Sequence, residues 1–282
     1  MNKQMNNQME TKPSSKHEIN LSFEADGITA GVAEFEWNGQ MYRATKQYDE
    51  NPDNPWEAWD CEPPVVAVGG RDYTYRKDGA DSPPSLTRQQ IMRNHREIEN
   101  LIKDTHRDNY WTDSEANEFN LLEHLLGDKP VEIGGYVYTV DELVSESLDE
   151  YLSGSMDCEM LDRMEEVWRW AEVPTWRDTL VGYSQGDWVD TMFVATPEWV
   201  KKCGVPEESV DKALESASYL FGAYIFGDVF GATVERLVSN GDDDAEWEEV
   251  DSCWGFYGYD DERSGLNQFV RDALRSEARV AA

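Results

Sequence analysis

The sequence predicts an α+β fold in which antiparallel hairpins and clustered helices form two sub-domains. Three pairs of strand-like runs are each divided by Asn-Gly or Gly-Gly, residues that accept the positive φ of tight hairpin turns. Other stretches place apolar residues every three to five positions, which is typical of amphipathic helices. Because strands and helices come in clusters, the strict strand–helix alternation of a parallel sheet is not expected.

The first part of the chain predicts a small unit rich in strands. Residues 1–17 are polar and without apolar periodicity, so we expect a disordered tail. Asn38-Gly39 and Gly69-Gly70 mark two hairpins. Apolar residues at helical spacing follow over 86–102. We therefore expect residues 18–112 to form a β-rich unit with one helix.

Residues 113–282 predict a larger α+β domain. One helix is expected from Asp113 to Gly127, followed by a hairpin around Gly134-Gly135 and a helix that begins at Asp141. The next helix is expected over 157–171. The remaining expectations are strands at 179–184 and 188–195, a helix that begins at Thr196-Pro197, a helix at 206–219, strands at 227–239 and 245–258, and a short helix at 266–274.

The charge of the chain is its most unusual property. It has 58 Asp and Glu against 25 Lys and Arg, which gives a formal net charge of −33 on 282 residues. Such a charge repels nucleic acid and anionic membranes, attracts basic protein surfaces, and destabilises the compact state by self-repulsion. The 11 Trp, 13 Tyr and 9 Phe distinguish the chain from disordered acidic segments, so we expect an aromatic-rich core.

The cysteines and the apolar runs indicate a cytoplasmic protein. Cys61, Cys158, Cys203 and Cys253 form no CxxC pair, and the polar start of the chain resembles no secretory signal, so no disulfide framework is expected. The most apolar run, 219–234, is interrupted by an acid and is too short to span a membrane.

A catalytic or metal site is not expected. Gly182–Gly186 matches the G-x-S-x-G pattern and resembles the nucleophile elbow of cutinases, yet all four histidines precede Ser184, whereas that elbow needs a histidine later in the chain. A tight turn is the alternative interpretation. Asp242, Asp243 and Asp244 lack the ligand spacing of a calcium loop, so we interpret them as a solvated hairpin tip and expect neither a metal nor a cofactor.

The acids are concentrated in blocks at 48–62, 141–166 and 241–251, which contain almost no bases. The carboxylates expected to bind a partner are Asp49, Glu50, Asp53, Glu57, Asp60, Glu62, Asp149, Glu150, Asp162, Glu165, Glu166, Asp242, Asp243, Asp244, Glu246, Glu248 and Glu249. The aromatic residues expected to anchor that partner are Trp56, Trp59 and Trp247, with burial in the core as the alternative.

Three explanations compete for this pattern. The acids can form a solvated surface with no partner, they can reflect adaptation to salt, or they can imitate nucleic acid. Asp162, Glu165 and Glu166 fall on one face of the helix predicted over 157–171. Carboxylates at such spacing roughly imitate a duplex, which carries one charge per about 1.7 Å of axis. We favour mimicry, on the magnitude of the charge and on its block pattern.

Three segments carry a resemblance. GYSQGDW at 182–188, FGDVFG at 226–231 and DSCWGFYG at 251–258 resemble a group of uncharacterised acidic proteins from phages and mobile elements. In overall character the chain is similar to antirestriction proteins of the ArdA and Ocr kinds, which imitate DNA and block host nucleases. No diagnostic motif of either kind is present, so the resemblance implies a class of function and assigns no residue.

The sequence therefore predicts an anti-defence protein of a phage or mobile element. It would occupy the basic nucleic-acid-binding groove of a host restriction or CRISPR-type complex in the host cytoplasm, without catalysis and without binding nucleic acid or membrane itself. The alternatives are a phage accessory enzyme or a structural protein whose acidity is incidental. Self-association into a homodimer stays open.

Overall fold

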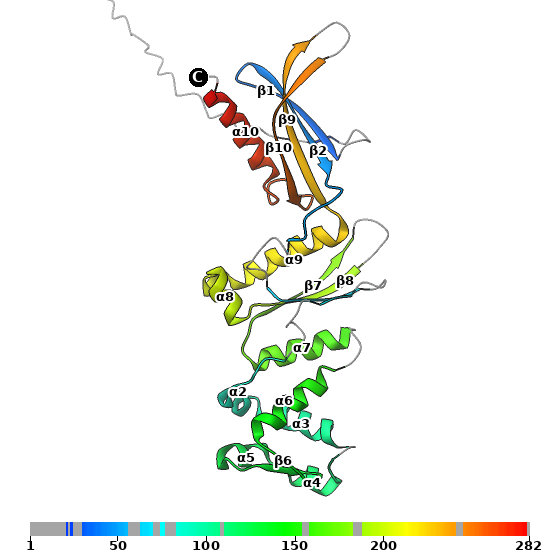
Figure 1. Ribbon diagram of the computed structural model, residues 1–282, viewed down its shortest axis with the longest axis vertical. Coiled ribbons are helices and arrows are strands. Elements are labelled where there is room, and N and C mark those ends of the chain that lie inside the picture. Colours follow the sequence, from blue (N-terminus) through cyan, green and yellow to red (C-terminus); the bar gives the residue numbers. More distant parts are fainter. Residues whose placement is uncertain are drawn as a thin grey trace, which may run out of the picture. The chain divides into compact units, whose positions relative to one another are not determined.

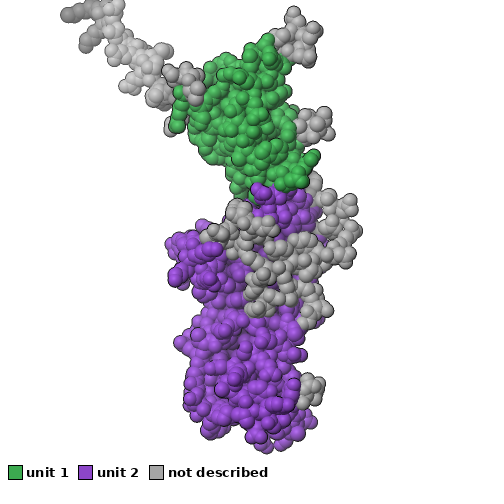
Figure 2. All heavy atoms as spheres, viewed as in Figure 1, with its two compact units in different colours: residues 1–51, 229–282 green, residues 52–228 purple. Residues whose placement is uncertain are grey.

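The chain forms two compact units, which Figure 2 shows in different colours. Unit 1 joins the two ends of the sequence, Met1–Asn51 and Val229–Ala282, and unit 2 is Pro52–Asp228. Helices and antiparallel sheets occur together, which confirms the predicted α+β class. The computed structural model describes residues 21, 23–24, 30–55, 63–69, 74–76, 83–107, 110–153, 158–182, 188–240 and 245–280.

Unit 1 contains a four-stranded antiparallel sheet and one long helix (Figure 1). The strand order is β1-β2-β9-β10. The elements are β1 (Gly31–Trp37), β2 (Gln40–Tyr48), β9 (Val229–Asn240), β10 (Ala245–Tyr257) and α10 (Leu266–Val280). The β1–β2 turn has the predicted geometry, because Asn38 and Gly39 both have positive φ, 51° and 80°.

The core of unit 1 lies between this sheet and α10. Tyr42 and Ala44 of β2 and Phe230 of β9 are buried on the face that α10 covers. Leu266, Val270, Ala273 and Leu274 of α10 complete the cluster, at the spacing that places residues on one side of a helix. The helix extends to Val280, beyond the short helix expected at 266–274.

The predicted boundary between residues 112 and 113 differs from the division in the structure. Strand β2 pairs with β9, from Tyr42 opposite Arg236 to Tyr48 opposite Phe230, so the first hairpin belongs with the end of the chain. The apolar face of a two-stranded hairpin is too small to be stable alone. Pairing with β9 and covering by α10 bury that face, a solution that local sequence patterns do not reveal.

Unit 2 is built around a second antiparallel sheet, of order β4-β3-β8-β7. The strands are β3 (Val65–Gly69), β4 (Thr74–Arg76), β7 (Thr175–Val181) and β8 (Trp188–Val194). Both faces of this sheet are buried: Met192 and Val194 of β8 belong to one hydrophobic cluster, and Phe193 to another. Strands β3 and β4 pair, as the second predicted hairpin requires, but Val68 lies opposite Thr74, so the connection is longer than the predicted two-residue Gly69-Gly70 turn.

Helices cover both faces of this sheet (Figure 1). On one face lie α8 (Pro197–Cys203), the short 3₁₀ helix η1 (Glu207–Ser209) and α9 (Val210–Phe226). On the other lies α7 (Cys158–Trp170), followed by a further helical layer. That layer contains α2 (Arg88–Arg93), α3 (His95–His106), α4 (Asp113–Glu118), α5 (Leu121–Gly127), α6 (Val140–Tyr151) and the hairpin of β5 (Val131–Ile133) and β6 (Tyr136–Tyr138).

Two further helical segments differ from the prediction. The single helix expected from Asp113 to Gly127 is two helices, because Phe119 is extended and the Asn120 side chain caps the second one by accepting from the Glu123 amide. Helix α9 begins at Val210 and continues to Phe226, where Gly227 in the left-handed conformation ends it.

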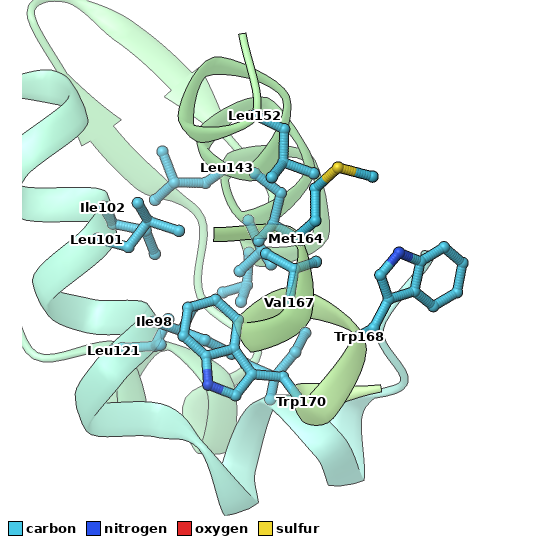
Figure 3. Close-up of a cluster of buried hydrophobic side chains, with 14 of the residues drawn as sticks. Ile98, Leu101, Ile102, Leu121, Leu143, Leu152, Met164, Val167, Trp168 and Trp170 are labelled. Atoms are coloured by element: carbon cyan, nitrogen blue, oxygen red, sulfur yellow. The ribbon is translucent and has the colours of Figure 1, made fainter. Parts of the chain in front are cut away.

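The largest buried cluster joins the helical layer of unit 2 to α7. Figure 3 shows Leu101 and Ile102 of α3 facing Leu143 of α6, with Met164 and Val167 of α7 against the same group. The segment predicted as a helix over 157–171 has apolar residues at helical spacing, and all of them are buried: Met160, Met164, Val167, Trp168 and Ala171. This packing fixes the position of α6, whose opposite side carries the acids discussed below.

We expect Leu143→Ala to lower the free energy of unfolding of unit 2 by about 2–5 kcal/mol, because Leu143 is completely buried and truncation leaves a cavity. Val137→Ala is the control, since Val137 is 66% exposed and its truncation should change stability by less than about 0.5 kcal/mol. Urea unfolding followed by tryptophan fluorescence measures both. Equal effects of the two variants would contradict the packing described.

Candidate functional site: an acidic helix face beside a tyrosine cluster

The first predicted acidic block is only partly described. Trp56, Glu57, Trp59, Asp60 and Glu62 lie outside the described residues, as do Asp242, Asp243 and Asp244 of the third block and Ser184 of the G-x-S-x-G motif. In unit 1, Asp49 accepts a hydrogen bond from the Asn51 amide at 3.1 Å, and Glu50 is exposed. In unit 2, Asp53 is exposed.

The acids of α7 have partners within their own unit. As predicted, Asp162 and Glu165 share a face, but Arg177 of β7 contacts both, with its Nη1 3.2 Å from Glu165 Oε2. Glu166 accepts a hydrogen bond from the Tyr151 hydroxyl at 3.0 Å. Arg177 and Tyr151 therefore engage carboxylates that the sequence analysis assigned to a partner. Because Arg177 lies outside the acidic block, the sequence pattern did not indicate this neutralisation.

Strand β10 shows the same pattern. Glu248 lies 2.5 Å from Arg236 of β9, and Glu249 accepts from the Ser252 hydroxyl at 3.0 Å. The half-buried Trp247 packs its ring under the guanidinium of Arg43, 4.4 Å from the ring centroid. Trp247 therefore makes an intramolecular cation–π contact, where the sequence predicted an anchor for a partner. Glu246 is exposed.

Helix α6 is different. It carries five acids, Asp141, Glu142, Glu146, Asp149 and Glu150, and no base. All five are exposed. Glu142 closes a capping box with Thr139, which lowers the pKa of Glu142 through hydrogen bonds to the Thr139 amide and hydroxyl. No ion pair of Glu146, Asp149 or Glu150 occurs within the described residues.

The spacing of these acids produces a charged stripe. Glu142, Glu146 and Glu150 follow each other at four-residue intervals, so each is about 6 Å further along the helix axis. Asp149 lies beside Glu146 at three-residue spacing. We call these four residues the α6 acidic face. Asp149 and Glu150 occupy the last turn, where the helix dipole disfavours negative charge.

A group of tyrosines lies within electrostatic reach of this face. Tyr110 and Tyr138 lie against His106, and Tyr136 contacts Tyr110. We call Tyr110, Tyr136 and Tyr138 the tyrosine cluster. The rings of Tyr110 and Tyr136 meet edge to face, with centroids 6.3 Å apart and an interplanar angle of 88°. Tyr136 is 62% exposed and Tyr110 is 40% exposed.

The β5–β6 turn places the two exposed rings together. Gly134 has a φ of +58°, and a Cβ at this position would lie 2.9 Å from the carbonyl oxygen of Tyr110. The Gly134-Gly135 hairpin, which the sequence predicted, can therefore approach the Tyr110 backbone closely. Tyr136 follows directly and meets Tyr110.

His106 lies beneath these rings and contacts α6. It is 1% exposed, and its Nε2 lies 3.2 Å from Ser147 Oγ. Ser147 Oγ donates its single hydrogen to the carbonyl of Leu143 at 2.8 Å, so it must accept from the imidazole. The neutral imidazole therefore carries its proton on Nε2. Its Nδ1 has no hydrogen-bond partner among the described residues.

The pKa values show that the acids and the aromatic rings influence each other. Burial lowers the pKa of His106, and the nearby charges of Glu146 and Glu150 act in the opposite direction. Burial raises the pKa of Tyr138, and the charge of Glu146 raises it further. Glu146 thus belongs to the same electrostatic environment as the tyrosine cluster.

Two pockets, of about 290 and 140 Å³, adjoin the first half of α6. Arg88, Asp128, Lys129 and Asp141 line the larger one, and Arg88 is already paired with Asp128 at 2.8 Å. Within the described residues, no group of three or more metal-binding side chains was found. None of the described helices is both long and apolar enough to cross a membrane.

Sequence reasoning missed part of this site. It selected Asp149 and Glu150, but it did not select Glu142, Glu146, Tyr110 or Tyr136. Two signals could have indicated them. The helix predicted from Asp141 contains no base. The third hairpin, VEIGGYVYTV, has two tyrosines and is too short to bury both of them itself.

Comparison with known proteins adds no information about this site. The chain matches no family model, no curated protein and no solved structure. The resemblance to acidic phage and antirestriction proteins therefore stays a prediction.

The buried His106 makes stability depend on pH. Burial lowers the pKa of His106 in the folded state, so just below pH 6.5 the imidazole is protonated in the unfolded chain but not in the folded one. The free energy of unfolding therefore decreases as the pH is lowered through this range. We expect wild type to lose up to about 1.4 kcal/mol more per pH unit than His106→Gln over this window. Urea unfolding at pH 7.5, 6.5 and 5.5 measures the difference. Parallel pH profiles would contradict this account.

Neutralising part of the α6 acidic face should stabilise the protein. We expect Glu146→Gln/Asp149→Asn/Glu150→Gln to increase the free energy of unfolding by about 1 kcal/mol at low salt, because these charges repel each other and two of them oppose the helix dipole. The gain should shrink in 0.5 M NaCl. A loss of stability in thermal or urea unfolding would show that the acids have stabilising partners.

Proposed function

We propose that this chain is an anti-defence protein of a phage or mobile element that acts in the host cytoplasm. It occupies the basic nucleic-acid-binding groove of a host restriction or CRISPR-type complex, stoichiometrically and without catalysis. The α6 acidic face takes the place of backbone phosphates in that groove. The observation that carries the proposal is this base-free helix, whose carboxylates repeat about every 6 Å without ion-pair partners in the described residues.

Net charge alone does not locate the binding surface. Asp and Glu outnumber Lys and Arg by 21 to 10 in unit 1 and by 37 to 15 in unit 2, so both units are acidic. The described acids of α7 and β10 include several that are neutralised by Arg177 and Arg236. No such neutralisation of the α6 acidic face occurs in the part of the chain that the structure describes, which supports this face as the surface offered to a cationic partner.

The electrostatics of α6 also favour a binding role. Acids in the last turn of a helix reduce its stability, and α6 itself has no base in that turn. Residues that reduce the stability of a fold are expected at positions where function requires them. A basic groove would relieve this repulsion, and ions released from the groove would add to the driving force.

The test is competition for a nucleic-acid-binding site. A labelled duplex is bound to purified restriction endonucleases and CRISPR effectors, and the protein is added at 50 and 200 mM NaCl. We expect wild type to displace the duplex from at least one complex, more weakly at the higher salt. Glu146→Gln/Asp149→Asn/Glu150→Gln should need about tenfold more protein for the same displacement.

A variant with the same change in net charge is the control. Glu207→Gln/Glu208→Gln/Asp211→Asn removes three exposed acids near the start of α9 and should displace the duplex as wild type does. Equal losses in the two variants would show that only net charge matters. Failure of wild type to displace the duplex from every complex in the panel would overturn the proposed function.

A further inference from the structure

We infer that the tyrosine cluster makes the α6 surface selective for arginine, so that the partner contributes an arginine side chain, stacked on Tyr136 and Tyr110, next to Glu146. This inference rests on the proposed function, because it specifies the partner's chemistry at the same surface. It requires an aromatic surface open to solvent, a carboxylate in its neighbourhood and a reason to prefer guanidinium over ammonium.

The open aromatic surface is provided by Tyr136 and Tyr110. Tyr136 is 62% exposed, although Tyr138, two residues further along β6, is half-buried. Its edge-to-face contact with Tyr110, at 6.3 Å, holds the ring in a defined orientation. A ring that is exposed and held can bind a planar cation with little loss of side-chain entropy.

The carboxylate is provided by α6. Helix α6 contacts β6, which carries Tyr136 and Tyr138, and packs against α3, which ends at His106. Glu146 has no ion-pair partner within the described residues. His106 contacts the rings of Tyr110 and Tyr138, and its Nε2 lies 3.2 Å from Ser147 Oγ, the residue that follows Glu146 on α6. The charge of Glu146 accordingly acts on both Tyr138 and His106. A cation over the tyrosines is therefore attracted by Glu146 as well as by the rings.

Arginine suits this combination better than lysine. The guanidinium is planar, weakly hydrated and able to stack on an aromatic face while it binds a carboxylate through two N–H groups. The lysine ammonium is compact and strongly hydrated, and it gains mainly from the charge. Arginine is also frequent in proteins that bind backbone phosphates, which is the class of partner proposed above.

The test compares two peptides of equal charge, nona-arginine and nona-lysine, by isothermal titration calorimetry at 150 mM NaCl. We expect wild type to bind the arginine peptide about tenfold more tightly. Tyr136→Leu keeps an apolar side chain but removes the ring, and it should reduce this preference to about threefold, while affinity for the lysine peptide stays the same. Tyr48→Leu, which changes an exposed tyrosine of unit 1, should leave the preference at its wild-type value.

The outcomes separate this inference from the proposed function. If Tyr136→Leu leaves the arginine preference unchanged, or if wild type has no such preference, the inference is wrong. In that case, weaker binding of both peptides by Glu146→Gln/Asp149→Asn/Glu150→Gln would still support α6 as a cation-binding surface. If that triple variant binds both peptides as wild type does, the α6 site itself is wrong. A wild-type dimer that Tyr136→Leu converts to monomer would also overturn the inference, because the tyrosines would then bind a second copy.

Discussion

Self-repulsion among carboxylates is the constraint that the rest of this structure has to satisfy. With 58 acids against 25 bases, the chain cannot pair most of its negative charges. Several of its cations connect different elements: Arg177 joins β7 to α7, Arg236 joins β9 to α10 through Glu277, and Lys46 joins β2 to Asp261 at 2.6 Å. Isolated ion pairs on a surface contribute little to stability. Where two elements pack against each other, however, such a pair reduces the repulsion between their carboxylates.

Aromatic and aliphatic burial supplies the stabilisation that the charges oppose. The sheet of unit 2 is covered on both faces, and Trp170, Phe193 and Phe221 are almost completely buried. In unit 1, Lys46 lies 4.0 Å from the centroid of Phe230, so even a buried cation is placed against an aromatic ring. Since burial of apolar area does not depend on charge, the core can tolerate a surface with a large excess of acids.

Local signals in the sequence predicted the elements well, because their causes are local. Asn38-Gly39 forms its turn through its own φ preferences, and the buried apolar residues of α7 follow from helical periodicity. The pairing of β2 with β9 and the position of Arg177 between two acids depend on which distant surfaces fit together. No pattern within ten or fifteen residues contains that information. For the same reason the acidic blocks were visible in sequence, but their internal neutralisation was not.

The absence of ion pairs to Glu146, Asp149 and Glu150 among the described residues needs a structural reason, because the neighbouring helix α3 and its C-cap supply bases. Helix α3 packs against α6, carries Lys103 and is followed by Arg107 at its C-cap. Lys103 is paired with Glu99 at 2.7 Å, and Glu99 also accepts from the Leu121 amide, so this base is held within α3. Arg107 contacts Asp104 at 3.2 Å. The acids of α3 thus engage these bases, and the carboxylates of α6 face outward without them. Glu142 is held in its capping box with Thr139, but Glu146, Asp149 and Glu150 have no ion-pair partner among the described residues. A cation that binds these three acids therefore displaces no existing ion pair, whereas one that binds at α7 or β10 does.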